Sequence, residues 1–322
     1  MNRRPNEDQV LGGLYGVLVG DALGVPYEFT HAKDLPPPAL IEMTPPPGFR
    51  RAHSAAPLGA WSDDGAQALC LLASLLYCQK VDIEDLARRL INWFEHGYMA
   101  VDYLVFDVGI QTSRALSAIK GGVPVEQAAP ASERNNGNGS LMRTLPLALW
   151  HTGSDEELVA DAMRQSLPTH AHLRSQLCCA LYCLWARGTL LGRGDPWTEA
   201  TRVLREMSRN QPEWESELTL HIRPERTAGG TGSGYVVDCL HSARLALEEP
   251  TFERAVRRAI AFGEDTDTTA AVAGGIAGIR FGLAGIPERW LSALPSRTTL
   301  VEPLANDLWA HLAKASARSG TS

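Results

Sequence analysis

Helical hydrophobic periodicity is the feature that most constrains how this chain can fold. After Asp82, apolar side chains recur at positions i, i+3, i+4, i+7, i+8 and i+11 over residues 83–94, which places them on one face of a helix. Residues 252–260 repeat this pattern, with arginines on the other side. We find no run of alternating β-branched residues bounded by turn pairs. The sequence therefore predicts an all-α fold with roughly ten or more helices.

Capping signals mark where several helices begin and end. Asp82 is a suitable N-cap for the first of them, and Ser154 with Glu157 has the pattern of a capping box. The apolar run over residues 172–186 predicts a helix closed by Gly188 as its C-cap. Further helices are expected over residues 66–77, 144–150, 235–247, 269–281 and 300–315.

Length and composition fit a single globular domain. The chain has 322 residues, of which 44% are hydrophobic, and a net charge of −7. This apolar fraction excludes wholesale disorder, and an acidic chain without a block of Lys and Arg makes nucleic-acid binding unlikely. No linker divides the chain, so residues 8–318 are expected to form one domain. Two segments, 30–60 and 209–234, look irregular, and long loops in compact domains usually serve function.

The sequence favours a cytoplasmic protein without a membrane segment. The most apolar early stretch, residues 10–20, is interrupted by Asp21, short of the about 20 residues that a membrane span needs. Residues 1–8 carry two arginines and two acids, which is not typical of a signal peptide. The six cysteines form no Cys-x-x-Cys pair and lie in apolar runs, as buried free thiols do in a reducing compartment.

Two acidic clusters stand directly before apolar helices. They are Ser62-Asp63-Asp64 and Asp265-Thr266-Asp267-Thr268. Each alone is explained by N-capping and the positive end of a helix. If packing unites them, however, four carboxylates repel one another and their pKa values rise. Hard divalent cations bind such carboxylate and hydroxyl oxygens, so the pair indicates a site for one or two metal ions.

Four further features are candidate functional sites with simpler alternatives. Glu28 follows a helix end, where a solvated surface glutamate is the ordinary interpretation. Asp107 precedes a predicted helix and is expected to cap it. The small residues of segment 137–143 can bring backbone amides to a ligand phosphate, or they form a plain polar turn. His170 is either a ligand contact or a histidine satisfied by its neighbours.

Several short motifs follow one another along residues 10–282. They are Gly20-Asp21-Ala22-Leu23-Gly24 with Glu28, Ser62-Asp63-Asp64, Gly137-Asn138-Gly139-Ser140-Leu141-Met142-Arg143, Thr169-His170, Gly234-Tyr235-Val236-Val237-Asp238 and Asp265-Thr266-Asp267-Thr268. In type and order they resemble the ADP-ribosylglycohydrolase family. The resemblance implies a single-domain orthogonal bundle of helices with two divalent cations, Mg2+ or Mn2+, at its mouth.

The resemblance also implies roles for individual residues. The metal ligands would be Ser62, Asp63, Asp64, Asp265, Asp267 and Thr268. The contacts to ADP-ribose would be Gly137, Asn138, Gly139, Ser140, Met142, His170 and Tyr235. Glu28 matches a family glutamate beside the metals, and Asp107 falls in the region of an aspartate proposed to transfer protons.

Three positions depart from the family pattern. Ser62 stands where the family usually has threonine, so the hydroxyl ligand is retained. Gly65 stands where threonine is frequent, which removes a possible contact to the metal or to the helix end. Glu264 replaces the usual glycine before the second cluster, and this extra carboxylate would affect metal affinity or substrate access.

The function expected from the resemblance is metal-dependent removal of ADP-ribose from a modified protein side chain, with arginine favoured as the acceptor. One alternative is a protein that only binds ADP-ribose. A related alternative is an immunity protein that neutralises an ADP-ribosyltransferase, with the segment 30–60 as a covering element. A third is a hydrolase of another ADP-ribosyl linkage, to serine, nucleic acid or a small molecule.

Overall fold

The computed structural model describes residues 5–226 and 229–319 and contains fifteen α-helices in that part of the chain. The helices are α1 (Glu7–Gly24), α2 (Asp63–Cys78), α3 (Ile83–His96), α4 (Ile110–Lys120), α5 (Val125–Ala128), α6 (Leu145–Trp150), α7 (Asp155–Ser166), α8 (Leu173–Leu190), α9 (Pro196–Ser208), α10 (Pro212–Ser216), α11 (Val236–Ala246), α12 (Phe252–Ile260), α13 (Thr266–Phe281), α14 (Glu288–Leu291) and α15 (Glu302–Ser319). Shorter 3-10 or π turns are η1 (Val25–Tyr27), η2 (Ala32–Asp34), η3 (Pro38–Leu40), η4 (Val101–Tyr103), η5 (Glu217–Ile222), η6 (Leu283–Gly285) and η7 (Arg297–Val301). Within the described residues, β pairing is limited to two isolated bridges. The all-α prediction is confirmed.

Most capping predictions hold, and two boundary predictions are wrong. The side chains of Asp82 and Ser154 cap α3 and α7, the latter with the full capping box. Gly188 does not end α8, which continues to Leu190; a Cβ at Gly188 would lie 3.1 Å from the Cβ of Pro196, so this glycine serves helix packing. The segment 209–234 is partly helical, because α10 and η5 form there and η5 buries apolar side chains in the core. Residues 1–4 and Ala228, which entered the sequence predictions, lie outside the described residues.

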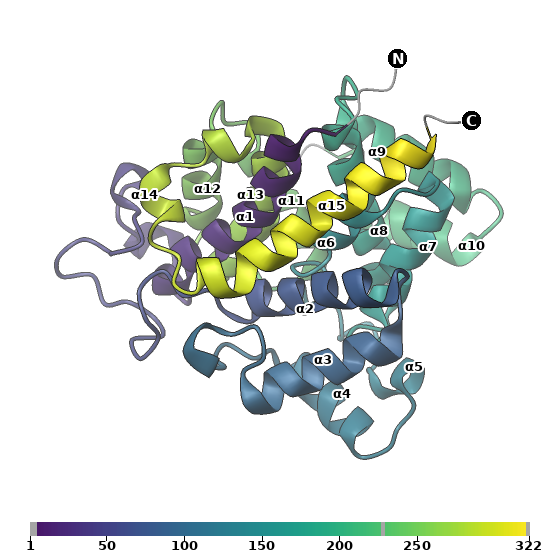
Figure 1. Cartoon of the computed structure of the whole chain (residues 1–322), viewed down its shortest axis with the longest axis horizontal. Helices are drawn as coiled ribbons and strands as arrows, with labels where there is room; N and C mark the ends of the chain where they lie inside the picture. Colours follow the sequence, from purple (N-terminus) through teal and green to yellow (C-terminus); the bar gives the residue numbers. More distant parts are fainter. Residues whose placement is uncertain (1–4, 227–228, 320–322) are drawn as a thin grey trace.

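A close antiparallel pair of helices, α1 and α13, forms the centre of the fold (Figure 1). Glycines make this approach possible: a Cβ at Gly16 would lie 2.2 Å from the carbonyl oxygen of Gly274, and one at Gly20 would lie 2.1 Å from that of Ala270. At the end of the interface, Gly24 lies against the backbone of Asp267. The pairing therefore fixes the start of α13 beside the end of α1.

Gly16→Ala is expected to destabilise the protein by about 2–3 kcal/mol, because the added methyl group meets backbone that has no rotamer to change. Urea unfolding followed by circular dichroism measures this. Gly194→Ala is the matched control, since a Cβ there meets no atom within 4 Å. Equal unfolding midpoints for the two variants would contradict the close-packing argument.

Helix α1 is the one described helix long and apolar enough to cross a membrane by length and composition, with a mean hydropathy of 1.3 over its most apolar window. Asp21 ends the apolar stretch as predicted, but the helix continues to Gly24, and the buried Asp21 carboxylate accepts the backbone N–H groups of Ser62 and Gly65 at the start of α2. However, 94% of that window is buried inside the protein. The apolar residues of α1 therefore pack the core.

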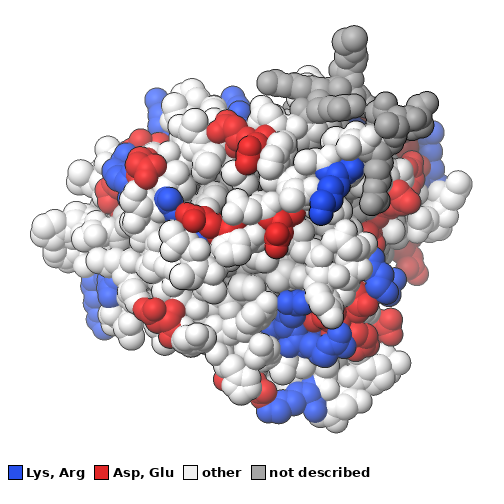
Figure 2. Space-filling model, in the orientation of Figure 1, with Lys and Arg blue, Asp and Glu red and all other residues white. Residues whose placement is uncertain are grey.

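The surface and the cysteines agree with the composition. On the face shown in Figure 2, the described residues present basic and acidic side chains interspersed, without the continuous basic surface typical of nucleic-acid binding. All six cysteines are free thiols; five are buried, and Cys78 is half-buried.

Candidate active site

The two acidic clusters, remote in sequence, meet in the structure. Ser62 caps α2, with its hydroxyl accepting the N–H of Asp64 at 3.3 Å. Thr268, in the first turn of α13, donates its hydroxyl to the Asp64 carboxylate at 3.2 Å. Asp265 occupies the N-cap position of α13 but makes no side-chain capping bond; it accepts from the Asn138 amide at 2.9 Å instead. Capping thus accounts for Ser62 and leaves the acids of the second cluster unexplained.

Asp21, near the end of α1, holds the start of α2 in place. Its carboxylate accepts the backbone N–H of Ser62 at 2.9 Å and that of Gly65 at 2.7 Å. Burial raises the pKa of Asp21 to about 7. Asp21 belongs to the motif Gly20-Asp21-Ala22-Leu23-Gly24, which does not by itself predict this role. The available signal was an acid inside an apolar helix, since buried carboxylates are held by specific donors.

Buried carboxylate oxygens without partners lie at the centre of the site. Asp64 Oδ1 and Asp267 Oδ2 are buried and have no hydrogen-bond partner. Glu28, Asp265 and Asp267 each offer an oxygen, and these oxygens lie within 4.8 Å of one another. Burial raises the pKa of Asp63, Asp64 and Asp267 well above the usual range of aspartate, and the neighbouring acids add to this. Such an arrangement fits a hard divalent cation, which satisfies unpaired oxygens and offsets their repulsion.

A cavity of about 640 Å³ opens above these carboxylates. From the acidic clusters it is lined by Asp63, Asp265 and Thr268, whereas Ser62, Asp64 and Asp267 are buried behind that lining. The same cavity is also lined by five of the residues expected to contact ADP-ribose. These are Gly137, Asn138, Gly139, Met142 and His170.

Ser140 and Tyr235, the other two expected contacts, lie outside the cavity lining. Ser140 is fully buried, and its hydroxyl accepts a hydrogen bond from Ser166 at 2.8 Å. Tyr235 forms an isolated β bridge with Gly137, and its hydroxyl accepts from Arg174 at 3.3 Å. Ser140 therefore holds the 137–143 segment through a buried hydrogen bond, and Tyr235, which is 38% exposed, holds it through the backbone bridge.

His170 is neutral in this site. Burial, with a contribution from Arg143, lowers the pKa of His170 to about 3. Its Nδ1 lies 2.8 Å from the hydroxyl of Thr169. A Cβ at Gly139 would lie 2.8 Å from the imidazole Cε1, so a glycine is required where the segment passes the ring. His170 is thus satisfied on one side while its ring lines the cavity.

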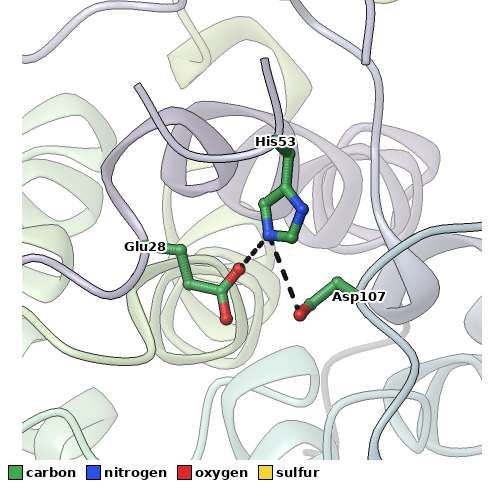
Figure 3. Close-up of side chains that lie close together, drawn as sticks. All are labelled: Glu28, His53 and Asp107. Carbon is green, nitrogen blue, oxygen red and sulfur yellow. Dashed lines mark hydrogen bonds and ion pairs between the residues drawn. The ribbon is translucent and has the colours of Figure 1, made fainter. Parts of the chain in front are cut away.

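Glu28 and Asp107 both line the cavity and have a histidine between them (Figure 3). His53 Nε2 is 2.5 Å from Glu28 Oε2 and 3.8 Å from Asp107 Oδ1. Glu28 is only 5% exposed, so the solvated-surface interpretation of this residue is wrong. Asp107 does not cap α4, whose N-cap is Gly109; its left-handed backbone (φ 56°) turns it toward His53 instead. No sequence motif marked His53.

Two of the departures from the family pattern do not reach the carboxylate centre. A Cβ at Gly65 would lie 2.8 Å from the Trp61 side chain, so this glycine is a close-packing position. Glu264 is 46% exposed, and its carboxylate pairs with His31 at 2.5 Å. Its backbone is left-handed (φ 60°), a conformation that favours glycine. The concern that Glu264 perturbs the metal site is therefore not supported by its position.

The all-α fold brings buried acids from two helix N-termini together beside a polar cavity, an arrangement whose oxygen ligands suit a divalent cation. The chain belongs to the ADP-ribosylglycohydrolase family, whose family model matches residues 2–318. It is 30% identical over 313 residues to ADP-ribosylarginine hydrolase Tri1 of Pseudomonas putida (strain GB-1), covering 94% of this chain and 78% of the relative.

Two further comparisons agree. The chain is 28% identical to the ADP-ribosyl-[dinitrogen reductase] glycohydrolase of Rhodospirillum rubrum, over 89% of this chain and 90% of the relative. A solved structure described as an ADP-ribosylglycohydrolase-related protein complex superposes with a TM-score of 0.72 and 31% identity, covering 95% of this chain and 98% of that chain. The protein is accordingly an enzyme of the glycohydrolase class.

Proposed function

We propose that this protein hydrolyses the bond between ADP-ribose and the arginine side chain of a modified protein, in a reaction that requires two divalent cations, Mg2+ or Mn2+. The observation that carries the proposal is the pair of orphaned carboxylate oxygens, on Asp64 and Asp267, beneath a cavity of about 640 Å³. The names of the bacterial relatives favour arginine as the acceptor.

The residues proposed to hold the cations come from both clusters. They are Ser62, Asp63, Asp64, Asp265, Asp267 and Thr268. Bound cations orient substrate hydroxyls and lower the pKa of a coordinated water toward neutrality. Asp21 and the amide of Gln67, which donates to Asp63 at 3.0 Å, hold the first cluster in place. This support lets the site keep several acids close together before a cation binds.

Glu28 and Asp107 are the groups proposed to handle protons. Burial raises the pKa of Glu28 to about 8 and also raises that of Asp107. Carboxyl groups with raised pKa values can donate a proton at neutral pH and accept one later in the same cycle. Both side chains line the cavity, so they are placed to reach a substrate held there.

The wall formed by Gly137, Asn138, Gly139 and Met142 is proposed to bind ADP-ribose. Glycines let the ligand approach the backbone closely, and backbone N–H groups suit the diphosphate. His170, neutral and buried, would contact the ligand through its ring. Ser140 and Tyr235 remain proposed contacts of ADP-ribose, although neither lines the cavity.

The direct test is release of free ADP-ribose from an arginine-ADP-ribosylated protein with Mg2+, with Mn2+ and with chelator. Release that depends on the metal and is absent from a serine-ADP-ribosylated protein is expected. Release from the serine-linked protein alone would replace arginine by serine as the acceptor. No release from either protein, with ADP-ribose binding still detected by calorimetry, would refute the hydrolase proposal in favour of a binding or immunity protein.

A further inference from the structure

We propose that His53 is a positioning residue that sets the orientation of Glu28 and Asp107 in the cavity lining. The inference rests on the proposed function for its kinetic consequences. Three separate segments meet at this point: Glu28 follows η1, His53 belongs to the long loop before α2, and Asp107 precedes α4 (Figure 3). The imidazole is therefore the link between two acids that belong to different parts of the chain.

The distances show how His53 connects the acids. Its Nε2 lies 2.5 Å from Glu28 Oε2 and 3.8 Å from Asp107 Oδ1. The imidazole Nε2 is within hydrogen-bond distance of Glu28 and within ion-pair distance of Asp107. Without the imidazole, Glu28 loses this hydrogen bond and Asp107 loses the nearby ring nitrogen, so the two acidic side chains are expected to separate.

The imidazole is itself held by aromatic neighbours. The ring centroid of His53 lies 5.6 Å from that of Phe29 and 5.1 Å from that of Phe106. These two residues are the chain neighbours of Glu28 and Asp107, so His53 packs against the same segments that it links. Its side chain is 16% exposed. Phe29 is itself 70% exposed, so the packing that restricts the His53 ring comes mainly from the half-buried Phe106.

His53, Asp107 and the neighbour of Glu28 share an unusual backbone conformation. His53 (φ 46°), Phe29 (φ 59°) and Asp107 (φ 56°) all adopt the left-handed conformation. This conformation is strained for a residue other than glycine and persists where surrounding contacts determine it. Three strained residues close together indicate that the fold maintains the contact between His53 and the two acids.

The loop that carries His53 is anchored on both sides of it. Ala52 donates its N–H to Pro26 at 3.0 Å, and Arg51 donates to the carbonyl oxygens of Ser54 and Ala56. Farther back, Glu42 pairs with Arg257 on α12 at 2.6 Å. The loop therefore delivers His53 from a fixed position, as a positioning role requires.

The test compares His53→Ala and His53→Gln, with His31→Ala as the control. Glutamine places its amide nitrogen near the position of Nε2 and keeps the donor, whereas alanine removes it. His53→Ala is expected to lower kcat about 10–100-fold with KM changed less than about 3-fold, as for other residues that orient catalytic groups. His53→Gln is expected to restore most of kcat.

His31 is a matched control because it also lies in this loop and pairs with a carboxylate, that of Glu264, but outside the cavity lining. His31→Ala is expected to keep kcat within about 2-fold of the unmodified protein. Equal losses in His53→Ala, His53→Gln and His31→Ala would indicate a general effect of the loop and overturn the proposal, as would an unchanged kcat in His53→Ala.

A crystal structure of His53→Ala separates this inference from the proposed function. Displacement of the Glu28 and Asp107 carboxylates from each other would support the positioning role even if the unmodified protein released no ADP-ribose. Unchanged carboxylate positions would refute it, whatever the activity.

Discussion

Asp267→Asn is expected to lower the rate of ADP-ribose release at least about 100-fold, because it removes a charged ligand from the proposed metal centre. Loss of a direct ligand is expected to lower the rate more than loss of a residue that only supports a ligand, which costs about 10–100-fold. Asparagine has nearly the same shape, and its side-chain oxygen can still accept the N–H of Thr268, as Asp267 Oδ1 does at 2.8 Å. The loss would therefore follow from chemistry and not from unfolding.

The same substitution is expected to raise stability in the absence of metal. Asp267 Oδ2 is buried without a partner, and burial, followed by the charges of Glu28 and Asp107, raises the pKa of this carboxyl well above its usual range. An amide removes the buried charge and supplies a donor to the neighbouring acids. We expect the melting temperature in chelator to rise by about 2–5 °C.

Calorimetry with chelator and the ADP-ribose release assay with metal measure the two effects. Asp307→Asn is the control, since Asp307 is an exposed aspartate remote from the cavity lining and should change neither quantity. If the variant keeps the full rate, Asp267 is not a ligand of the proposed metal centre. A variant that loses both rate and stability would indicate that the carboxylate is needed for folding.

The helices and the acidic clusters could be predicted from the sequence because each is marked by neighbouring residues in the chain. Ser62 precedes an apolar run and does cap α2, and the helical spacing of apolar residues after Asp82 does correspond to α3. Local signals failed where tertiary packing decided the outcome. Gly188 has the composition of a C-cap, yet its missing side chain serves the contact with Pro196 inside α8.

The sequence predicted a metal site only on the condition that packing brings the two acidic clusters together. Nothing local in Asp64 or Thr268 requires that they touch; their contact follows from the glycine interface that places α13 against α1. Asp107 illustrates the same limit, because its left-handed backbone redirects a residue that otherwise has the position of a helix cap. His53 carries no motif, and its role depends on a loop folding back over the site.

Arg143→Met is expected to have the largest effect on stability, because Arg143 is a fully buried charge whose contacts in the described structure are all with neutral acceptors. Its guanidinium donates to Thr169 at 2.8 Å, to the backbone oxygen of Gln165 at 2.9 Å and to Gln67 at 3.1 Å. Burial lowers its pKa to about 10, so it stays charged at neutral pH.

Through these bonds, Arg143 links the first acidic cluster to His170. Gln67 also donates to Asp63 at 3.0 Å, and the hydroxyl of Thr169 lies 2.8 Å from Nδ1 of His170. Methionine fills much of the volume but leaves the buried acceptors unpaired, each at a cost of about 1–3 kcal/mol. The positive charge that offsets the nearby acids is also lost.

We expect Arg143→Met to lower stability by about 3–5 kcal/mol and the melting temperature by about 5–10 °C. Arg143→Lys should recover little, because an ammonium keeps the charge but cannot reproduce the fork of donors. Arg164→Met, an exposed substitution on α7 next to Gln165, should shift the melting temperature by less than about 2 °C. If Arg143→Lys melts at the temperature of the unmodified protein, the charge matters and the donor geometry does not. If Arg143→Met does so as well, Arg143 is not the link that holds the first acidic cluster and His170 together.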